Sequence, residues 1–493
     1  LTEHRFQELP QLSDLLNVPA PIRGPARQPA LHRDVCTCMS MLLRTTLAWT
    51  LLVLVVSVPA ADARGLRMGF FDVVFTEPAA EREPWLARAE ESGSDIVRLN
   101  SGWGAIAPTR PRAPTDPADP AYSWQSLDDA VKAADARGLE VIISLTGAPA
   151  WAAGRRPPAG IIPSSWRPQA KPYGPFARAL AKRFSGSYPD PGRPGAMLPR
   201  VRYYLPWNEP NLDAYLAPQW VKRDGRFRPA SPAIYRSLLN EFARGVKSVS
   251  RRNKVIAGAT APFGDSPGGG RMEAVTFVRA LLRRRTVFDV LDHHPYSIYG
   301  PRAPASSPNN VTVPDFGKLR RPLRAAERAG RIVPRGRKRM WVTEISWDSS
   351  PPDPQGVPRR RHARWLQEAM YVLWRQGVDT VIWFQIRDQA PEPSFAATNQ
   401  SGVYFRDGRP KLTQRAFAFP FVATRRSRGG VRVWTRAPAR GTLRFEARSG
   451  RGWRTVRRVA VRRHQVVQRR LRVGRRAQLR ARMGKLTSLA SRG

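Results

Sequence analysis

Cysteine is nearly absent from this chain of 493 residues. Its two cysteines, Cys36 and Cys38, both lie close to the amino terminus. From residue 39 onward the sequence therefore excludes disulfides, thiol nucleophiles and cysteine ligands for a metal. Such a composition is compatible with export into an oxidising compartment, where a free thiol is liable to be oxidised.

Acidic residues are also few. The chain has 38 Asp and Glu residues against 83 Lys and Arg, and its formal charge of +45 is carried almost wholly by arginine. A charge of this size is compatible with binding to nucleic acid, acidic polysaccharide or a cell envelope. Because the arginines are spread over the whole chain, a drift of composition toward arginine explains the charge equally well. The charge alone assigns no partner.

The apolar run near the amino terminus is too short to cross a membrane. Residues 47–58 form a largely apolar run of 12 residues, whereas a membrane-spanning helix needs roughly 20. Arg44 precedes the run, and a small-x-small cleavage site ends at Ala63. This order is typical of a signal peptide. We therefore expect a signal peptide at residues 41–63 and a secreted protein, extracellular or associated with the cell surface, without a stable membrane span.

The expected signal peptide does not lie at the start of the sequence. Signal peptides are amino-terminal, and Met39 or Met41 would provide a suitable start. We therefore expect residues 1–40 to be an extension read from upstream of the true start. Exported protein whose amino terminus lies before Met39 would contradict this expectation.

From about Arg67 onward, short apolar runs alternate with amphipathic helical segments. Several runs are continuous blocks of Val, Ile, Leu and Phe, which are typical of strands buried on both faces. Eight such units predict a closed (β/α)8 barrel over residues 64–420. An open doubly wound sheet agrees less well with the sequence, since the Gly-x-Gly-x-x-Gly motif typical of that fold does not follow the first strand. The eight expected strands are residues 68–72, 95–99, 140–145, 201–205, 255–259, 287–292, 340–343 and 380–384.

Helices and long loops fill the intervals between these strands. Ser231-Pro232 predicts the start of one helix, with serine as the N-cap. Pro- and Gly-rich stretches follow several strands, where a barrel places its active-site loops. Trp166, Tyr215 and Trp220 in these loops are candidates for lining a ligand groove, or are loop anchors packed on the barrel. The other expected helices are residues 126–136, 272–284, 316–329 and 362–376, and the stretches are 107–122, 152–173, 211–230 and 299–315.

The pattern changes after Pro420. Short alternating runs separated by Gly/Arg turns predict a small β-sandwich over residues 421–493. This segment has 23 Lys and Arg residues and one acidic residue, Glu446, so it accounts for +22 of the formal charge. Arginine on the outer face of a sheet is ordinarily just solvated. The sharper interpretation is a module that contacts an anionic polysaccharide or the cell envelope.

Two carboxylates stand at the ends of predicted strands. Glu209 ends the fourth strand region in Trp-Asn-Glu-Pro-Asn, with Asn208 beside it, and Glu344 ends the seventh in Trp-Val-Thr-Glu-Ile-Ser-Trp. The carboxyl ends of barrel strands converge on one mouth. Hydrolysis of a glycosidic bond needs two carboxyl groups, one to protonate the leaving oxygen and one to meet the developing oxocarbenium centre. The pair therefore predicts a glycosidase.

In these motifs the sequence resembles clan A glycoside hydrolases, above all family 39 and next the cellulase-like enzymes of family 5. The resemblance covers roughly residues 66–420. It implies a (β/α)8 barrel, a retaining hydrolysis of O-glycosidic, mainly β, bonds of an extracellular poly- or oligosaccharide, Glu209 as acid/base and Glu344 as nucleophile. Ser346-Trp347 departs from family 39, which usually has Trp-Asn after the nucleophile.

The resemblance also implies substrate-binding residues. Arg98 matches the strand-two arginine near the nucleophile, Asn208 the amide that holds a sugar 2-hydroxyl, and His294 the strand-six histidine. Tyr296 matches the tyrosine that hydrogen-bonds the nucleophile, and Trp383 the tryptophan that forms a sugar-stacking floor. No cofactor is implied.

Three other interpretations of the sequence deserve comparison. His293-His294 is a formal candidate for a metal pair, but adjacent side chains on a strand face opposite ways, so we expect no metal site. The barrel could also bind glycans without cleaving them, tethered by its basic module to an anionic envelope. Nucleic-acid binding is a third reading of the arginine-rich tail, but it conflicts with export, so we expect no nucleic-acid partner.

Overall fold

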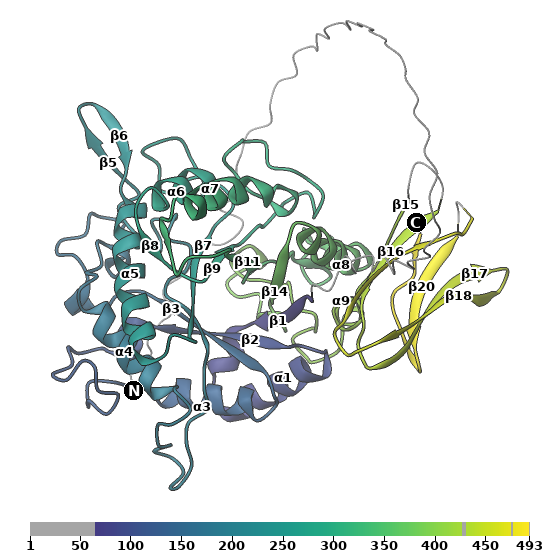
Figure 1. Cartoon of the computed structure of the whole chain (residues 1–493), viewed down its shortest axis with the longest axis horizontal. Coiled ribbons are helices and arrows are strands. Elements are labelled where there is room, and N and C mark those ends of the chain that lie inside the picture. The colour runs from purple at the N-terminus through teal and green to yellow at the C-terminus, as the bar shows by residue number, and fades with distance from the viewer. Residues whose placement is uncertain (1–64, 426–429, 475–476, 493) are drawn as a thin grey trace, which may run out of the picture.

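A computed structural model describes residues 65–425, 430–474 and 477–492. Eight parallel strands of this part close into a barrel surrounded by helices, which confirms the predicted fold class (Figure 1). The last strand pairs with the first and so closes the sheet. In order around the barrel the strands are β1 (Arg67–Phe71), β2 (Ile96–Gly102), β3 (Glu140–Thr146), β4 (Tyr203–Leu205), β7 (Lys254–Thr260), β9 (Val290–His293), β11 (Arg339–Val342) and β14 (Val378–Phe384).

All eight expected strand regions contain a barrel strand, with differences at the boundaries. β4 begins at Tyr203, two residues later than expected, and the sixth region is divided into a short strand β8 (Thr286–Val287) and β9. β8 pairs outside the barrel with β10 (Ile332–Val333). Two further short pairs lie in the loops, namely β5 (Trp220–Arg223) with β6 (Arg226–Pro229), and β12 (Ser349–Ser350) with β13 (Val357–Pro358).

The helices pack around the outside of the barrel. Ser231 lies inside the first turn of its helix instead of capping it, and its hydroxyl donates a hydrogen bond to Gln219 Oε1 at 2.8 Å. Four helices were not predicted, namely α1 (Ala79–Glu91), α2 (Trp103–Ile106), α4 (Tyr173–Arg183) and α9 (Leu412–Ala418). α1 and α4 contain proline, which obscures their helical period. The helices are α1 (Ala79–Glu91), α2 (Trp103–Ile106), α3 (Gln125–Asp135), α4 (Tyr173–Arg183), α5 (Ser231–Val249), α6 (Ala274–Leu281), α7 (Gly317–Arg328), α8 (Arg359–Arg375) and α9 (Leu412–Ala418).

The interior of the barrel is a packed layer of apolar side chains. Alternate residues of each strand point inward, as in Ile96, Ile142, Ile256 and Ile382, and they form one cluster with Trp341. Their neighbours on the same strands point outward and join the larger core between the strands and the helices. The barrel is therefore filled, and any site has to be built above this layer by residues at the strand ends.

The carboxyl-terminal residues form two antiparallel sheets that share a core. One sheet has the order β15-β16-β19 and the other β18-β17-β20-β21, with β22 paired to β20. Phe421, Val433, Phe445 and Leu479 belong to the cluster between the sheets. The strands are β15 (Phe421–Arg425), β16 (Val431–Arg436), β17 (Gly441–Ser449), β18 (Gly452–Val461), β19 (Val466–Leu471), β20 (Gln478–Met483), β21 (Leu486–Thr487) and β22 (Ser491–Arg492).

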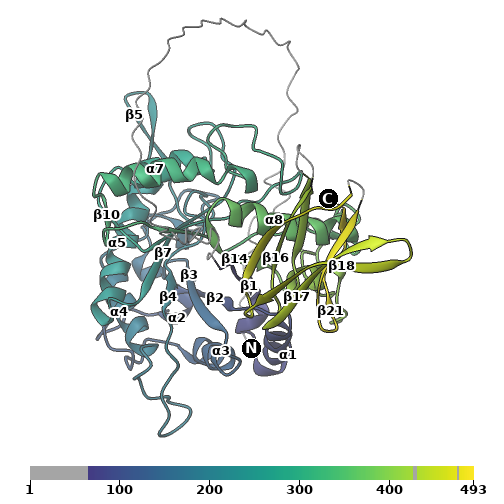
Figure 2. The same cartoon turned by 45° about the vertical axis from the view of Figure 1, so that its right-hand side comes forward.

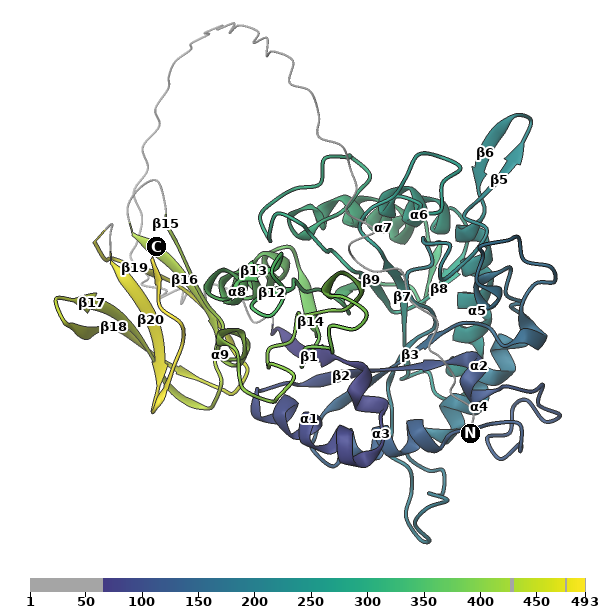
Figure 3. The same cartoon turned by 180° about the vertical axis from the view of Figure 1, so that it is seen from behind.

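This sandwich packs against the barrel beside α1, α8 and α9 (Figures 2 and 3). Arg436 of β16 is fully buried at the contact and forms a salt bridge with Asp95 at 2.5 Å. Its guanidinium also donates to the Leu66 carbonyl oxygen at 2.9 Å, and His464 forms a second bond to Asp95. Asp95 directly precedes β2, so this contact lies at the amino end of the barrel strands, away from the strand ends that carry Glu209 and Glu344.

The expected signal peptide at residues 41–63 and the expected extension at residues 1–40 lie outside the described residues. Among the residues that the structure describes, no helix has both the length and the apolar character that crossing a bilayer requires.

Candidate active site

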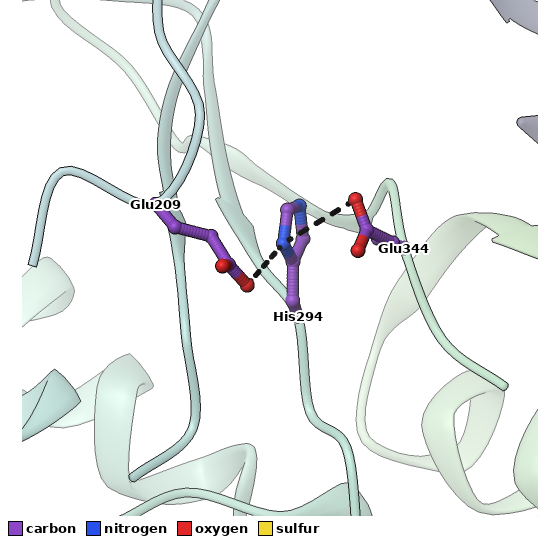
Figure 4. Close-up of side chains that lie close together, drawn as sticks. All are labelled: Glu209, His294 and Glu344. Carbon is purple, nitrogen blue, oxygen red and sulfur yellow. Dashed lines mark hydrogen bonds and ion pairs between the residues drawn. The ribbon is translucent and has the colours of Figure 1, made fainter. Parts of the chain in front are cut away.

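The two candidate carboxylates meet at the carboxyl end of the barrel. Glu209 follows β4, Glu344 follows β11, and the ring of His294, which follows β9, lies between them (Figure 4). One donor atom from each of these three residues lies within 4.8 Å of the others. The sequence separates the two glutamates by more than a hundred residues, and closure of the barrel brings them together.

The backbone around Glu209 is held in an uncommon conformation. Glu209 has φ of 37°, in the left-handed region. A residue other than glycine keeps this conformation only where the surrounding structure holds it in place. Its amide donates to the Ala259 carbonyl oxygen at 2.9 Å. Two residues further on, the side-chain Nδ2 of the buried Asn211 donates to the carbonyl oxygens of Ala261 and Met272, at 3.1 and 2.8 Å. These bonds tie the Asn-Glu-Pro-Asn turn to the end of β7 and direct the Glu209 side chain into the mouth.

Glu209 is buried, and its neighbours act on it in opposite directions. Burial raises the pKa of Glu209, and the charge of Glu344 raises it further, while His294 lowers it. His294 Nδ1 lies 3.0 Å from Glu209 Oε1 and 3.9 Å from Glu344 Oε2. The net effect is a carboxyl group that holds its proton at a higher pH than an exposed glutamate does.

His294 is a cation in this surrounding. Burial lowers its pKa, but Glu344, Asp292 and Glu209 outweigh burial and raise it to about 9. Its Nε2 lies 3.1 Å from Thr343 Oγ1, and Thr343 in turn donates its amide to Asp292 Oδ1 at 2.9 Å. Asp292 and Thr343 were not predicted as site residues. They fix the imidazole ring from the side opposite Glu209.

Glu344 is held by an arginine and a tyrosine. Arg98 of β2 donates to Glu344 Oε2 at 3.0 Å and to Asn208 Oδ1 at 2.7 Å. The Tyr296 hydroxyl donates to Glu344 Oε1 at 2.7 Å. Arg98 is 1% exposed, so its charge is little screened by solvent. These bonds fix the Glu344 side chain at the mouth of the barrel.

Six of the seven residues singled out in the sequence therefore converge on one site, namely Arg98, Asn208, Glu209, His294, Tyr296 and Glu344. Tyr215, one of the aromatic loop candidates, also lies in it. Burial raises the pKa of Tyr215, and the charges of Glu209 and Glu344 add to this effect. The hydroxyl also interacts with Asn208. Nothing in the sequence around Tyr215 indicated a role in the site, except that it is an aromatic residue in the loop after β4.

Trp383 is the exception, and its predicted role is wrong. Its ring is fully buried outside the barrel wall, 6.0 Å from Trp347 and 5.7 Å from His362 between ring centroids. The inward positions of β14 belong to its neighbours Ile382 and Phe384. A buried ring on the outer side of the strand offers no face to a sugar. Phe384 is the aromatic residue at this point of the mouth.

Glu209, His294 and Glu344 are also the described residues that could hold a metal ion. The arrangement fits a metal poorly. Arg98 lies 3.0 Å from Glu344, so a divalent cation would face a buried positive charge. Both nitrogens of His294 already have partners in Glu209 and Thr343. His293 lies apart from this group, with its ring bonded to Thr260 and the Val311 carbonyl oxygen.

Comparison with known proteins shows the fold. The sequence matches no protein-family model and no curated protein. Among solved structures, a family 39 glycoside hydrolase from Bacteroides cellulosilyticus WH2 is similar, with 19% identity over 83% of this chain and 81% of that one and a TM-score of 0.51. A monomeric beta-xylosidase from Caulobacter crescentus CB15 has 16% identity over 78% and 82% and a TM-score of 0.50. At such identities the likeness shows the fold alone.

Proposed function

We propose that this protein is a retaining glycosidase that hydrolyses O-glycosidic, mainly β, bonds of an extracellular poly- or oligosaccharide. The observation that carries the proposal is the short separation of Glu209 and Glu344, whose nearest oxygens lie within 4.8 Å. Retaining enzymes place their two carboxyl groups about 5–5.5 Å apart, whereas inverting enzymes need about 6.5–9.5 Å to admit a water between them. The architecture shared with a family 39 enzyme supports the proposal.

In the first step Glu344 attacks the anomeric carbon while Glu209 gives its proton to the leaving oxygen. The bond from the anomeric carbon to that oxygen breaks, and an ester between the sugar and Glu344 forms. The raised pKa of Glu209 suits it to carry the proton. Arg98 and Tyr296 keep Glu344 oriented for the attack.

In the second step Glu209 is a base. Its carboxylate takes a proton from water, the water oxygen attacks the anomeric carbon, and the bond to Glu344 breaks. His294 donates a hydrogen bond to Glu209 in both of its protonation states and so keeps it near the leaving oxygen and the water. Asn208, held by Arg98, is placed to bond the sugar 2-hydroxyl.

We further propose that the protein is secreted and that its basic sandwich contacts an anionic polysaccharide or the cell envelope. The signal-peptide pattern at residues 41–63 and the absence of cysteine after residue 38 support export. The excess of Lys and Arg in residues 421–493 supports the contact. No metal or cofactor takes part in the steps above.

The test is turnover of a panel of aryl β-glycosides and polysaccharides by the protein and by two variants. Glu344→Gln should lose activity on every substrate. Glu209→Gln should keep part of its activity on aryl glycosides with an acidic leaving group, since that group departs without a proton. The first product formed should have the anomeric configuration of the substrate, as read by nuclear magnetic resonance. An inverted first product would refute the retaining mechanism, and binding of a glycan without turnover would favour a non-catalytic barrel.

A further inference from the structure

One face of the larger carboxyl-terminal sheet points away from the core of the sandwich. Along β17, the residues Leu443, Phe445 and Ala447 point into the core between the two sheets. Arg444, Glu446 and Arg448 alternate with them and belong to the opposite face. We call this opposite side of β18, β17 and β20 the outer face. Figures 1 and 3 show β17 and β18 at the end of the sandwich that lies away from the barrel.

The outer face carries a row of arginines across three neighbouring strands. Arg444 on β17 is paired directly with Arg458 on β18 and with Arg482 on β20. Arg444 and Arg458 are exposed, and Arg482 is partly exposed. Adjacent strands are about 4.8 Å apart. Like charges directly opposite each other destabilise an antiparallel pair, so this register holds three cations together at a cost to the sheet.

The next rows of the outer face combine a carboxylate, further cations and an aromatic ring. Glu446 accepts a bond from Arg480 Nε at 2.7 Å and lies 3.9 Å from Arg482. The Arg480 guanidinium lies 4.1 Å from the ring centroid of Trp453. Trp453 is paired with Arg448, whose guanidinium donates to Gln478 Oε1 at 3.2 Å. The outer face thus carries five arginines together with one carboxylate and a half-buried indole.

The protein supplies no further counter-charge for this face from its own module. Glu446 is the one acidic residue between residues 421 and 493. Among the described residues, no carboxylate lies within 4.0 Å of the guanidinium groups of Arg444, Arg448 or Arg458. The paired arginines repel one another. A bound anion would therefore be stabilised by its attraction to the arginines and would also reduce the repulsion between them.

A hollow continues the face on the side of Arg448. It measures about 590 Å³ and is lined by Arg425, Arg448 and Arg492 together with Gly450, Ala477 and Gln478. The cationic surface is therefore concave at one end.

We propose that the outer face binds an anionic polysaccharide, of the polyuronate class. The arginine row sets three cationic side chains on neighbouring strands, about 4.8 Å apart at the backbone, so that carboxylates of a polyuronate chain would meet several guanidiniums. Trp453, one face of which lies against the Arg480 guanidinium, adds an aromatic side chain that a sugar ring can contact. The choice of a polysaccharide over a nucleic acid rests on the proposed function, an exported glycosidase. The face deepens that function by holding the barrel close to an acidic glycan.

The experiment measures binding of the purified protein to polygalacturonate, with its methyl-esterified, neutral form and double-stranded DNA as comparisons. The test variant is Arg444→Gln, Arg458→Gln and Arg482→Gln combined. Its matched control removes the same charge from exposed barrel arginines, as Arg251→Gln, Arg252→Gln and Arg283→Gln. Trp453→Ala tests the aromatic contact. Thermal unfolding of each variant checks that it folds.

The test variant should bind polygalacturonate about tenfold more weakly, with a lower salt dependence, and the control should stay within about twofold. Trp453→Ala should weaken binding to polygalacturonate more than binding to DNA. Equal losses of affinity in the test variant and the control would overturn the proposal, because binding would then depend on the net charge of the protein and not on the outer face. Tighter binding to DNA that Trp453→Ala leaves unchanged would overturn the choice of a glycan. The measurement does not depend on turnover, so a failure of the catalytic proposal leaves it readable.

Discussion

Replacing His294 tests the electrostatics that divide the roles of the two glutamates. His294 is a cation below a pH of about 9, and it lowers the pKa of Glu209, which burial and Glu344 raise. His294→Gln keeps a polar side chain of similar reach but removes the charge. Glu209 should therefore bind its proton more tightly in the variant, and its pKa should rise.

The size of the shift follows from the bond that changes. A hydrogen bond to a charged group contributes about 1.5–3 kcal/mol, and one pKa unit corresponds to about 1.4 kcal/mol. With His294 Nδ1 only 3.0 Å from Glu209 Oε1, the pKa of Glu209 should rise by about 1–2 units. Activity that needs a protonated Glu209 is lost as the pH rises through its pKa. The alkaline limb of kcat/KM should consequently move up by about 1–2 pH units.

The assay is the pH profile of kcat/KM for an aryl glycoside with a poor leaving group, on which proton donation limits the rate. His293→Gln is the matched control, because His293 is equally buried and adjacent but bonds Thr260 and the Val311 carbonyl oxygen. Its alkaline limb should stay in place. An alkaline limb that moves by less than about 0.3 units in His294→Gln would refute the assignment of Glu209 as the acid or of His294 as its cation.

Three further predictions concern stability. Arg436→Gln should lower the free energy of unfolding by about 1.5–3 kcal/mol, because Asp95 loses its bond to the guanidinium and keeps only His464 as a charged partner. Urea denaturation measures this change, with Arg432→Gln on the same strand as a near-neutral control. Burial raises the pKa of Asp348 to about 7, so the folded state binds its proton more tightly than the unfolded state, and stability should fall as the pH rises from about 4 to 7. Asp348→Asn should flatten that pH dependence of the melting temperature, and an unchanged slope would contradict it. Trp383→Phe should lower stability by about 1–3 kcal/mol and leave KM within about twofold, whereas a large rise in KM would restore Trp383 as a sugar-binding residue.

The barrel could be predicted from the sequence because its strands are easy to recognise. A strand buried on both faces must be a continuous apolar block, and eight such blocks at regular intervals favour one architecture. Glu209 and Glu344 could be placed because they end predicted strands, and such ends converge on the mouth of a barrel. Arg98 was placed only through the resemblance to clan A enzymes, and the structure puts it beside Glu344.

The failure at Trp383 has the opposite cause. The end of β14 reads Val-Ile-Trp-Phe, and it is apolar on both faces. Alternation then carries no information about which residues point inward, so the sequence could not distinguish Trp383 from Phe384. The resemblance to clan A enzymes suggested the tryptophan, and the register of β14 against β1 decides for the phenylalanine. Tyr215 could not be assigned for a related reason, because the path of a loop is set by its packing and not by a period.

In the carboxyl-terminal module, the composition gives the number of arginines but not their positions relative to one another. Twenty-three basic residues in one segment are compatible with an anionic partner and equally with a drift toward arginine. The two explanations differ in where the charges lie, since drift places arginines without regard to strand pairing. Pairing determines that Arg444 faces Arg458 and Arg482 directly, and that Arg480 lies over Trp453. A sheet under no selection for an anion gains stability from any change that breaks such a row. The matched arginine variants therefore separate the two explanations, because drift predicts that the row and the barrel arginines are equivalent.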